Sequence, residues 1–141
     1  MILNKPYVLS EMKKTTTDVT TFTFTPQDGT SIDFSPGMFA MLTYTDTQTG
    51  KKISRAFSMA NPPSSDKLQF FISMIGGQLT SKLAEVKVGD VYYISAPYGQ
   101  FKFDLNSGNK FLFLAGGTGL APFYSMLEFM ISKGAKPALY N

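Results

Sequence analysis

The sequence predicts a mainly β chain: a small, closed six-stranded antiparallel barrel with one capping helix, followed by the truncated start of a Rossmann-like α/β unit. Short runs rich in β-branched and aromatic residues, separated by turn signals, recur between residues 6 and 103. A single helical spacing interrupts them at residues 78–86. After Phe103 the composition changes to a polar linker, a continuous apolar run, a glycine-rich turn and an amphipathic helix.

The first two strands are predicted at residues 6–15 and 19–26. The second alternates threonine with phenylalanine, as expected for a strand with one buried face, and Asp28-Gly29 marks the turn after it. The other four strands lie between turn signals, at residues 35–44, 53–60, 66–75 and 91–97. We expect most of the aromatic side chains in these strands to fill the core: Phe22, Phe24, Phe39, Phe70, Phe71, Tyr92 and Tyr93.

The capping helix is predicted between the fifth and sixth strands, where Leu79, Leu83 and Val86 have helical spacing and Gly89 ends the stretch. Gly77 would stand at the start of this helix, where backbone N–H groups have no partner within the helix. Such N–H groups either see only water or bind an anion.

The C-terminal segment has the pattern of an α/β unit. Residues 110–115 form a continuous apolar run, as expected for a strand buried on both faces of a parallel sheet. A glycine-rich turn and an amphipathic helix at residues 123–133 follow, with Gly134 at the helix end. Residues 136–141 would begin a further strand.

The length of 141 residues fits one domain plus a fragment of a second. We place the barrel domain at residues 1–107 and the N-terminal fragment of an α/β domain at residues 108–141. Such a fragment would expose unpaired strand edges, so we expect the helix to dock on the barrel or the chain to self-associate through this unit.

Composition excludes several functional classes. A net charge of +3 with interspersed lysines gives no argument for nucleic acid. The N-terminus lacks the apolar run of a signal peptide, and residues 111–131, although long enough to span a membrane, contain glycines, a proline and Glu128. We therefore expect a cytoplasmic protein with no membrane partner. With no histidine and no cysteine, triads, thiol nucleophiles, iron–sulfur ligation and the usual zinc sites are excluded. A cofactor would carry any demanding chemistry, and no metal site is expected.

Arg55 is the only arginine beside twelve lysines in this chain. Its rigid fork of donors matches phosphate or carboxylate oxygens two at a time, which favours an anion site. A surface arginine paired to an acid is the alternative. Similarly, Gly117 and Gly119, with Pro122 in the first turn of the helix, suit a pyrophosphate at a helix start, but a purely structural turn is the alternative.

Four motifs occur in a characteristic order: R-A-F-S at 55–58, G-G-Q-L-T-S-K-L at 76–83, A-P-Y-G-Q-F at 96–101 and A-G-G-T-G-L-A-P at 115–122. Together they resemble the ferredoxin–NADP⁺ reductase superfamily over residues 6–141. The resemblance implies a flavin-binding barrel followed by a nicotinamide-nucleotide domain.

The resemblance also implies roles for particular residues. Arg55 would bind the flavin phosphate and Ser58 would contact flavin N5 or O4, where hydride arrives; Phe57 replaces the usual tyrosine beside the ring. The residues implied in flavin binding are Arg55, Ala56, Phe57, Ser58, Ile72, Ser73, Met74, Gly77, Gln78, Leu79 and Thr80. Those implied in NAD(P) binding are Gly116, Gly117, Thr118, Gly119 and Pro122.

The implied cofactor is FAD, and FMN is the alternative because Ser73 and Met74 stand where the family often has cations. The implied activity is electron transfer from NADH or NADPH through the flavin to an acceptor protein or small molecule, and nothing in the chain selects between the two donors. The alternative function is a flavin-binding or protein-interaction module of a larger electron-transfer assembly, with no turnover of its own.

Overall fold

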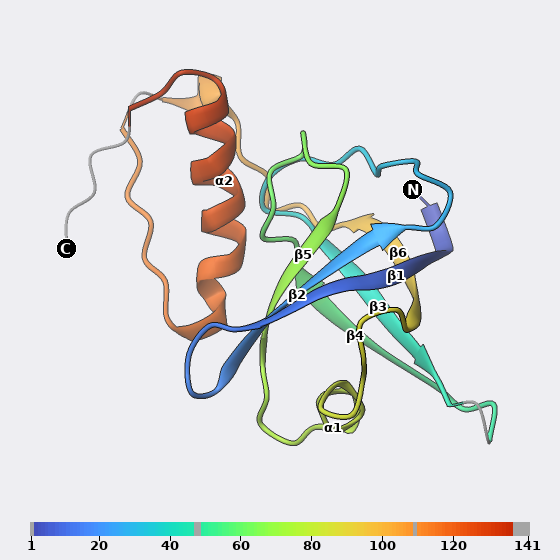
Figure 1. Ribbon diagram of the computed structural model, residues 1–141. Helices are drawn as coiled ribbons and strands as arrows, with labels where there is room; N and C mark the ends of the chain where they lie inside the picture. The colour runs from blue at the N-terminus through green and yellow to red at the C-terminus, as the bar shows by residue number, and fades with distance from the viewer. Residues whose placement is uncertain (1, 47–48, 109, 137–141) are drawn as a thin grey trace.

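A computed structural model describes residues 2–46, 49–108 and 110–136. It contains six strands, two α-helices and two short 3₁₀ helices (Figure 1). The strands are β1 (Ile2–Lys14), β2 (Val19–Pro26), β3 (Phe39–Thr45), β4 (Lys52–Ser58), β5 (Leu68–Ser73) and β6 (Val91–Tyr98). The helices are α1 (Gln78–Leu83) and α2 (Leu120–Ser132), and the 3₁₀ helices span Leu105–Ser107 and Gly117–Gly119.

The six strands form one antiparallel sheet in the order β4-β3-β6-β1-β2-β5. The mainly β fold predicted from the sequence is therefore confirmed. The sheet curls so that its two edge strands, β4 and β5, approach each other, with the rings of Phe57 and Phe70 6.2 Å apart. No ladder joins β4 to β5 in the described part of the chain, so the sheet is a half-barrel, and the closed ladder expected from the sequence does not form.

The inner face of the curled sheet holds the core because side chains alternate between the two faces of each strand. Phe22, Phe24, Phe70 and Tyr92 are buried there, as expected. The same expectation is wrong for Tyr93, which is 41% exposed because it follows Tyr92 and points to the outer face. Phe39 and Phe71 also lie on the outer face and are only half-buried, so they are not core residues either.

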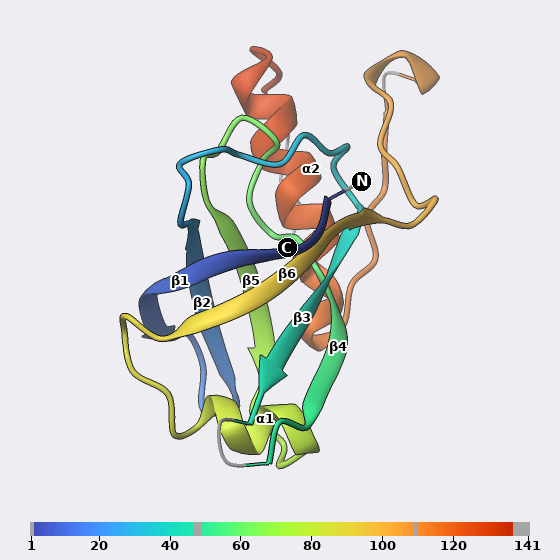
Figure 2. The same ribbon diagram turned by 90° about the vertical axis from the view of Figure 1, so that its right-hand side faces the viewer.

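Helix α1 closes one end of the half-barrel (Figure 2). Leu79 and Leu83 are almost completely buried and join the core. The helix ends at Leu83, earlier than the sequence suggested, and a turn closed by a hydrogen bond from the Lys87 N–H to Asp90 Oδ2, 2.9 Å long, leads into β6.

Helix α2 lies beside the half-barrel on the side of β5 (Figure 1). The ring of Tyr124 meets that of Phe71 edge to face, with 5.5 Å between centroids. Helix docking, one of the two outcomes expected from the sequence, is therefore what the structure shows. Gly134 has φ +84° just after the helix and closes it, as predicted.

The strand predicted at residues 110–115 is not formed. Described residues of this segment run beside α2, held by an aromatic cluster in which Phe113 stacks on Phe123 at 4.9 Å and Phe103 meets Phe111 at 4.9 Å. Leu112 and Leu114 are about four-fifths exposed, because no strand among the described residues covers them. The further strand predicted at residues 136–141 lies almost wholly outside the described residues. No helix in the described ranges is long and apolar enough to cross a membrane.

Gly37 is required where the loop before β3 meets both the segment after β6 and α2. Its φ is +98°, and a Cβ there would lie 2.3 Å from the Phe101 carbonyl oxygen and 2.6 Å from Met126 Cε. We expect Gly37→Ala to cost roughly 1–2 kcal/mol of unfolding free energy beyond the cost of the left-handed conformation alone. Gly29→Ala is the matched control, since Gly29 has φ +71° but open space around it. Equal losses in urea unfolding of the two variants would refute the proposed clash.

The loop after β2 is anchored by a buried lysine. Lys5 is 7% exposed, its Nζ lies 2.8 Å from Asp28 Oδ1, and it also donates to the Thr30 carbonyl. The hydrogen bond from Lys5, followed by that from the Thr30 N–H, holds the pKa of Asp28 below its ordinary value. A carboxyl with a lowered folded pKa stabilises the fold above its unfolded pKa and loses that contribution as the pH falls through the folded value.

We therefore expect Asp28→Asn to be less stable than the parent at pH 7, with the difference shrinking as the pH falls below about 4. Urea unfolding at a series of pH values would measure it. Asp33→Asn, which removes an exposed carboxyl from the same loop, is the matched control. A difference between Asp28→Asn and parent that stays constant down to pH 2 would contradict this assignment.

Candidate functional site

Arg55 lies on the edge strand β4 and points toward the start of α1. Its Nη1 donates to the Ser54 carbonyl at 2.8 Å, and its Nη2 lies 3.5 Å from Gln78 Oε1. In the described part of the chain no carboxylate lies within ion-pair distance of Arg55, which is exposed. The alternative of a surface arginine neutralised by an acid is therefore not supported, and the remaining donors of the guanidinium are open to an anion.

The first turn of α1 faces the same space. Gly76 has φ +80°, Gly77 is the N-cap, and no side chain caps the free N–H groups. The hydroxyl of Thr80 donates to the Gly77 carbonyl at 3.1 Å, so Thr80 also serves the turn itself. Leu79 is 1% exposed, so its side chain anchors the helix and only its backbone is available to a ligand. No acidic residue occupies this turn, and Arg55 provides the full positive charge beside it.

Ser58 lies at the other end of β4, within a row of residues on the outer face of the sheet. Phe39 on β3 is directly opposite both Ser58 and Tyr98, so the three side chains share one face. The rings of Phe39 and Tyr98 stack at 5.6 Å with 23° between their planes. This row offers a hydroxyl next to a flat aromatic surface. Phe39 was predicted as a core residue and Tyr98 was not predicted as a site residue; strand alternation and the A-P-Y-G motif are the signals that could have found them.

The two residues between Arg55 and Ser58 differ in what they can offer. Ala56 is exposed, opposite Met41 on β3. Phe57 is half-buried, with its ring against Phe70, so most of its area contributes to the core and only one part remains accessible.

The predicted residues at the end of β5 are less available. Ile72 is 1% exposed and its side chain belongs to the core. The N–H of Met74 already donates to the Asp18 carbonyl at 2.7 Å, and Ser73 is half-buried. Because β5 pairs only with β2 in the described sheet, and the Gln69 groups on its other edge already bond to Ala60 and Asn61, the backbone groups available on that edge are those beyond Gln69. A role for this segment would come from those backbone groups and not from the Ile72 side chain.

The glycine-rich turn before α2 is an open 3₁₀ helix, Gly117–Gly119. Gly117 has φ +54°, and a Cβ at Gly116, Gly117 or Gly119 would meet no atom within 4 Å. Packing within the chain therefore does not explain three glycines, whereas close approach of a ligand to the backbone would. Thr118 lies within this turn and Pro122 in the first turn of α2, where the absence of its N–H costs no hydrogen bond.

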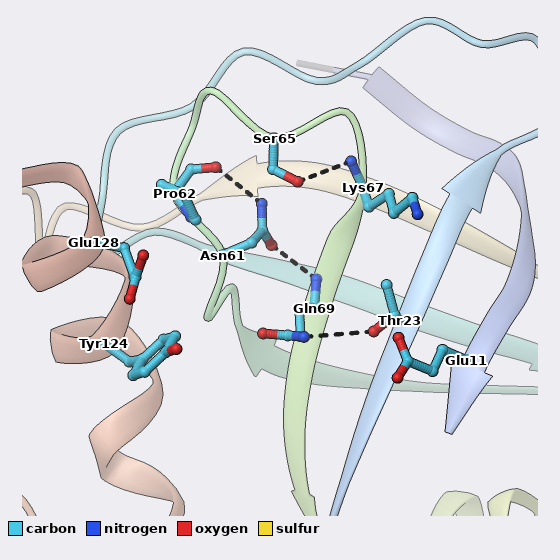
Figure 3. Close-up of a pocket in the computed structure, with 9 residues that line it drawn as sticks. All are labelled: Glu11, Thr23, Asn61, Pro62, Ser65, Lys67, Gln69, Tyr124 and Glu128. Atoms are coloured by element: carbon cyan, nitrogen blue, oxygen red, sulfur yellow. Dashed lines mark hydrogen bonds between the residues drawn. The ribbon is translucent and has the colours of Figure 1, made fainter. Parts of the chain in front are cut away.

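A cavity of about 310 Å³ lies elsewhere, between the outer face of β2 and β5 and helix α2 (Figure 3). Gln69 and Asn61 line it, together with the carboxylates of Glu11 and Glu128. Burial, followed by the charge of Glu128, raises the pKa of Tyr124 at its wall. It shares no residue with the predicted flavin site, and two carboxylates against one cation, Lys67, give its lining a net negative charge that disfavours a phosphate. We therefore place the candidate site at Arg55 and Ser58 and not in this cavity.

Comparisons with known proteins agree on one family. The model of the oxidoreductase FAD-binding domain matches residues 6–103. The flavodoxin/ferredoxin–NADP reductase of Rhodobacter capsulatus is 38% identical over 112 residues, which cover 77% of this chain and 41% of that protein. The ferredoxin–NADP reductase of Azotobacter vinelandii is 37% identical over 112 residues, covering 77% of this chain and 43% of that protein. The chain thus spans about two fifths of the length of these relatives.

Among solved structures, the ferredoxin reductase in carbazole 1,9a-dioxygenase superposes with a TM-score of 0.82 at 26% identity, covering 95% of this chain and 40% of that one. The ferredoxin NADP⁺ reductase from Neisseria gonorrhoeae with bound FAD and NADP has a TM-score of 0.70 at 25% identity, covering 91% of this chain and 52% of that one.

Proposed function

Because this chain belongs to the oxidoreductase FAD-binding domain family, within the ferredoxin–NADP⁺ reductase superfamily, we propose that it binds FAD along β4 and serves electron transfer from NAD(P)H to an acceptor. Flavin and donor chemistry come to this chain from its relatives, and its own residues supply the fit. The observation that carries the proposal is the presence of Arg55 and Ser58 on one edge strand. In the described residues Arg55 has no carboxylate partner and the hydroxyl of Ser58 has no hydrogen-bond partner.

Arg55 and Ser58 are three residues apart on an extended edge strand, which separates their Cα atoms by about 10 Å and directs their side chains to opposite faces of the unpaired β4 edge. One end of this span presents a guanidinium that has no carboxylate partner in the described residues, beside the start of α1, and the other presents a hydroxyl beside the stacked rings of Phe39 and Tyr98. Flavin nucleotides likewise carry phosphate at one end and a flat ring at the other. The donor set therefore fits a flavin nucleotide.

When bound, FAD supplies the hydride and electron transfer that a chain without histidine or cysteine cannot perform with its side chains. In this proposal Arg55 binds phosphate by paired hydrogen bonds, assisted by the backbone of Gly77 and Gln78 and by Thr80. Ser58 donates a hydrogen bond at the reactive edge of the ring. Ala56, Phe57 and the free edge of β5 at Ile72, Ser73 and Met74 line the binding surface. FMN remains the alternative cofactor, since Ser73 and Met74 are uncharged and provide no cationic side chain for a second phosphate.

The donor site in this proposal is the open turn formed by Gly116, Gly117, Thr118 and Gly119, ahead of Pro122. Its exposed backbone can approach a pyrophosphate, and NADH and NADPH are both compatible with it. The acceptor is an electron-acceptor protein or a small molecule, as in the named electron-transfer components among the relatives.

The second candidate function is a flavin-binding module of a larger electron-transfer assembly, without turnover of its own. The observation that favours it is the names of several relatives, which are reductase or electron-transfer components of oxygenases and therefore parts of larger assemblies. Domains at residues 1–107 and 108–141, with self-association through the second unit, remain predictions; light scattering would test the self-association.

The visible spectrum of the purified protein tests the proposal. A flavin absorbance band after addition of FAD, with saturable fluorescence quenching, is the expected result. Bleaching of that band by NADH or NADPH under anaerobic conditions would favour the reductase over the module. Absence of FAD and FMN binding in the micromolar range would overturn both functions.

A further inference from the structure

A buried hydrogen bond joins α2 to the chain directly after β4. The hydroxyl of Ser125 donates to the backbone carbonyl of Asn61 at 2.7 Å. Ser125 is 0% exposed and Asn61 is 5% exposed, so neither group can exchange its partner for water. Leaving either group unpaired in this environment would be unfavourable, and the bond therefore favours one position of the helix.

Asn61 is itself firmly held to β5. Its Oδ1 accepts from the Gln69 N–H at 2.7 Å (Figure 3). The Gln69 carbonyl in turn accepts from the Ala60 N–H at 2.8 Å. The preceding residue, Met59, donates its N–H to the Met38 carbonyl at 3.2 Å. Every residue from Ser58 to Asn61 is thus tied to a neighbouring strand or loop, and Ser58 lies only three positions before the carbonyl that Ser125 contacts.

On the other side of the bond, α2 connects Ser125 rigidly to the glycine turn. The helix begins at Leu120, so Ser125 lies less than two turns from Gly119. The neighbouring contacts of this helix face are apolar: Ala121 and Met126 are buried, and Tyr124 meets Phe71. Such contacts tolerate sliding and rotation, whereas a single directional bond selects one register.

We propose that Ser125 is a positioning residue that, through Asn61, sets the place of the Gly116–Gly119 turn relative to Ser58. This inference rests on the proposed function, because that turn is the donor site and Ser58 is at the reactive edge of the flavin site. A shift of about 1 Å between reacting groups can cost about a hundredfold in rate, so a buried bond that fixes the turn has a direct kinetic consequence.

The test compares Ser125→Ala with Ser132→Ala. Ser132 is on the same helix, and its hydroxyl donates to the Phe129 carbonyl at the same distance of 2.7 Å, but it is exposed and bonds only within α2. Because the chain has no cysteine, Thr118→Cys and Lys14→Cys can be added to each variant as two unique attachment points for nitroxide labels. Pulsed electron paramagnetic resonance then measures the distance between the glycine turn and the barrel without any cofactor.

We expect one narrow label distance in the parent and in Ser132→Ala, and a broadened or shifted distribution in Ser125→Ala. Identical distributions in Ser125→Ala and Ser132→Ala would overturn the inference. Far-UV circular dichroism of each variant checks that the barrel is folded; hydrogen exchange limited to α2 in Ser125→Ala would support a local effect, whereas exchange throughout the barrel would overturn it.

Kinetics of the unlabelled, FAD-loaded proteins provide the second readout. Reduction by NADH or NADPH in a single turnover should be roughly ten- to a hundredfold slower in Ser125→Ala than in Ser132→Ala. Reduction by dithionite, which does not use the glycine turn, should be unchanged. Equal slowing with both reductants would indicate a general structural role and overturn the inference. A parent that binds no flavin would refute the proposed function, while the label distances would still decide whether Ser125 holds the turn.

Discussion

Replacing Ser58 with alanine is expected to slow reduction of bound flavin by about 10²–10³-fold while weakening flavin binding much less. In the described residues the hydroxyl of Ser58 has no hydrogen-bond partner, although it is only half-exposed beside Phe39 and Tyr98. A hydroxyl at this place would donate a hydrogen bond to the charge that develops on the flavin ring as the ring is reduced. A bond that strengthens only during the reaction contributes to rate and little to affinity.

Stopped-flow reduction by dithionite and by a nicotinamide donor, together with a flavin titration, would measure the two effects for Ser58→Ala. Ser54→Ala is the matched control, because Ser54 is on the same face of β4 but its hydroxyl already accepts from Thr43 Oγ1 at 2.9 Å. Equal reduction rates in Ser58→Ala and the parent would exclude the assigned role. The two reductants also distinguish Ser58, which should affect both, from Ser125.

Replacing Arg55 with lysine is expected to weaken flavin binding by about 1.5–3 kcal/mol, the contribution of a charge-assisted hydrogen bond. Lysine keeps the positive charge but lacks the planar fork that binds two phosphate oxygens together. Loss of affinity in this variant would therefore report on geometry and not on net charge. Arg55 has no carboxylate partner in the described ranges, so the substitution breaks no ion pair.

Fluorescence titration with FAD and with FMN would measure the change for Arg55→Lys. Lys52→Arg is a suitable control, since it changes the same functional group in the opposite direction at the exposed start of the same strand. Unchanged affinity in Arg55→Lys would show that Arg55 does not anchor the phosphate. A loss that is similar for FAD and FMN would place the contact at the phosphate that both nucleotides share.

The strands were predictable because their signals are local. Alternation of threonine and phenylalanine in β2 follows from one buried face, and Asp28-Gly29 and Gly76-Gly77 mark turns by their backbone preferences. The segment at residues 110–115 shows the limit of this reasoning. Its apolar composition is typical of a buried strand, but a strand also requires a neighbour, and none is present for it among the described residues.

The candidate site was predictable only in part. The single arginine and the two glycine-rich segments marked one position on β4 and two turns as candidate binding sites. The roles of these residues came from the family resemblance. Their arrangement could not be read from the chain. Ile72 proved to be buried and Met74 already hydrogen-bonded, whereas Tyr98 joined the row beside Ser58 through a pairing with Phe39 that spans 59 positions of sequence.

By itself, the sequence determined the mainly β class, the positions of the strands and the dependence of any redox chemistry on a cofactor, because alternation, turn propensity and side-chain chemistry are properties of neighbouring residues. Only the tertiary structure decided that β4 and β5 are the unpaired edges, that Arg55 meets Gln78 and that Ser125 is bonded to Asn61. These features depend on strand order and on the docking of α2, which arise from contacts between distant segments.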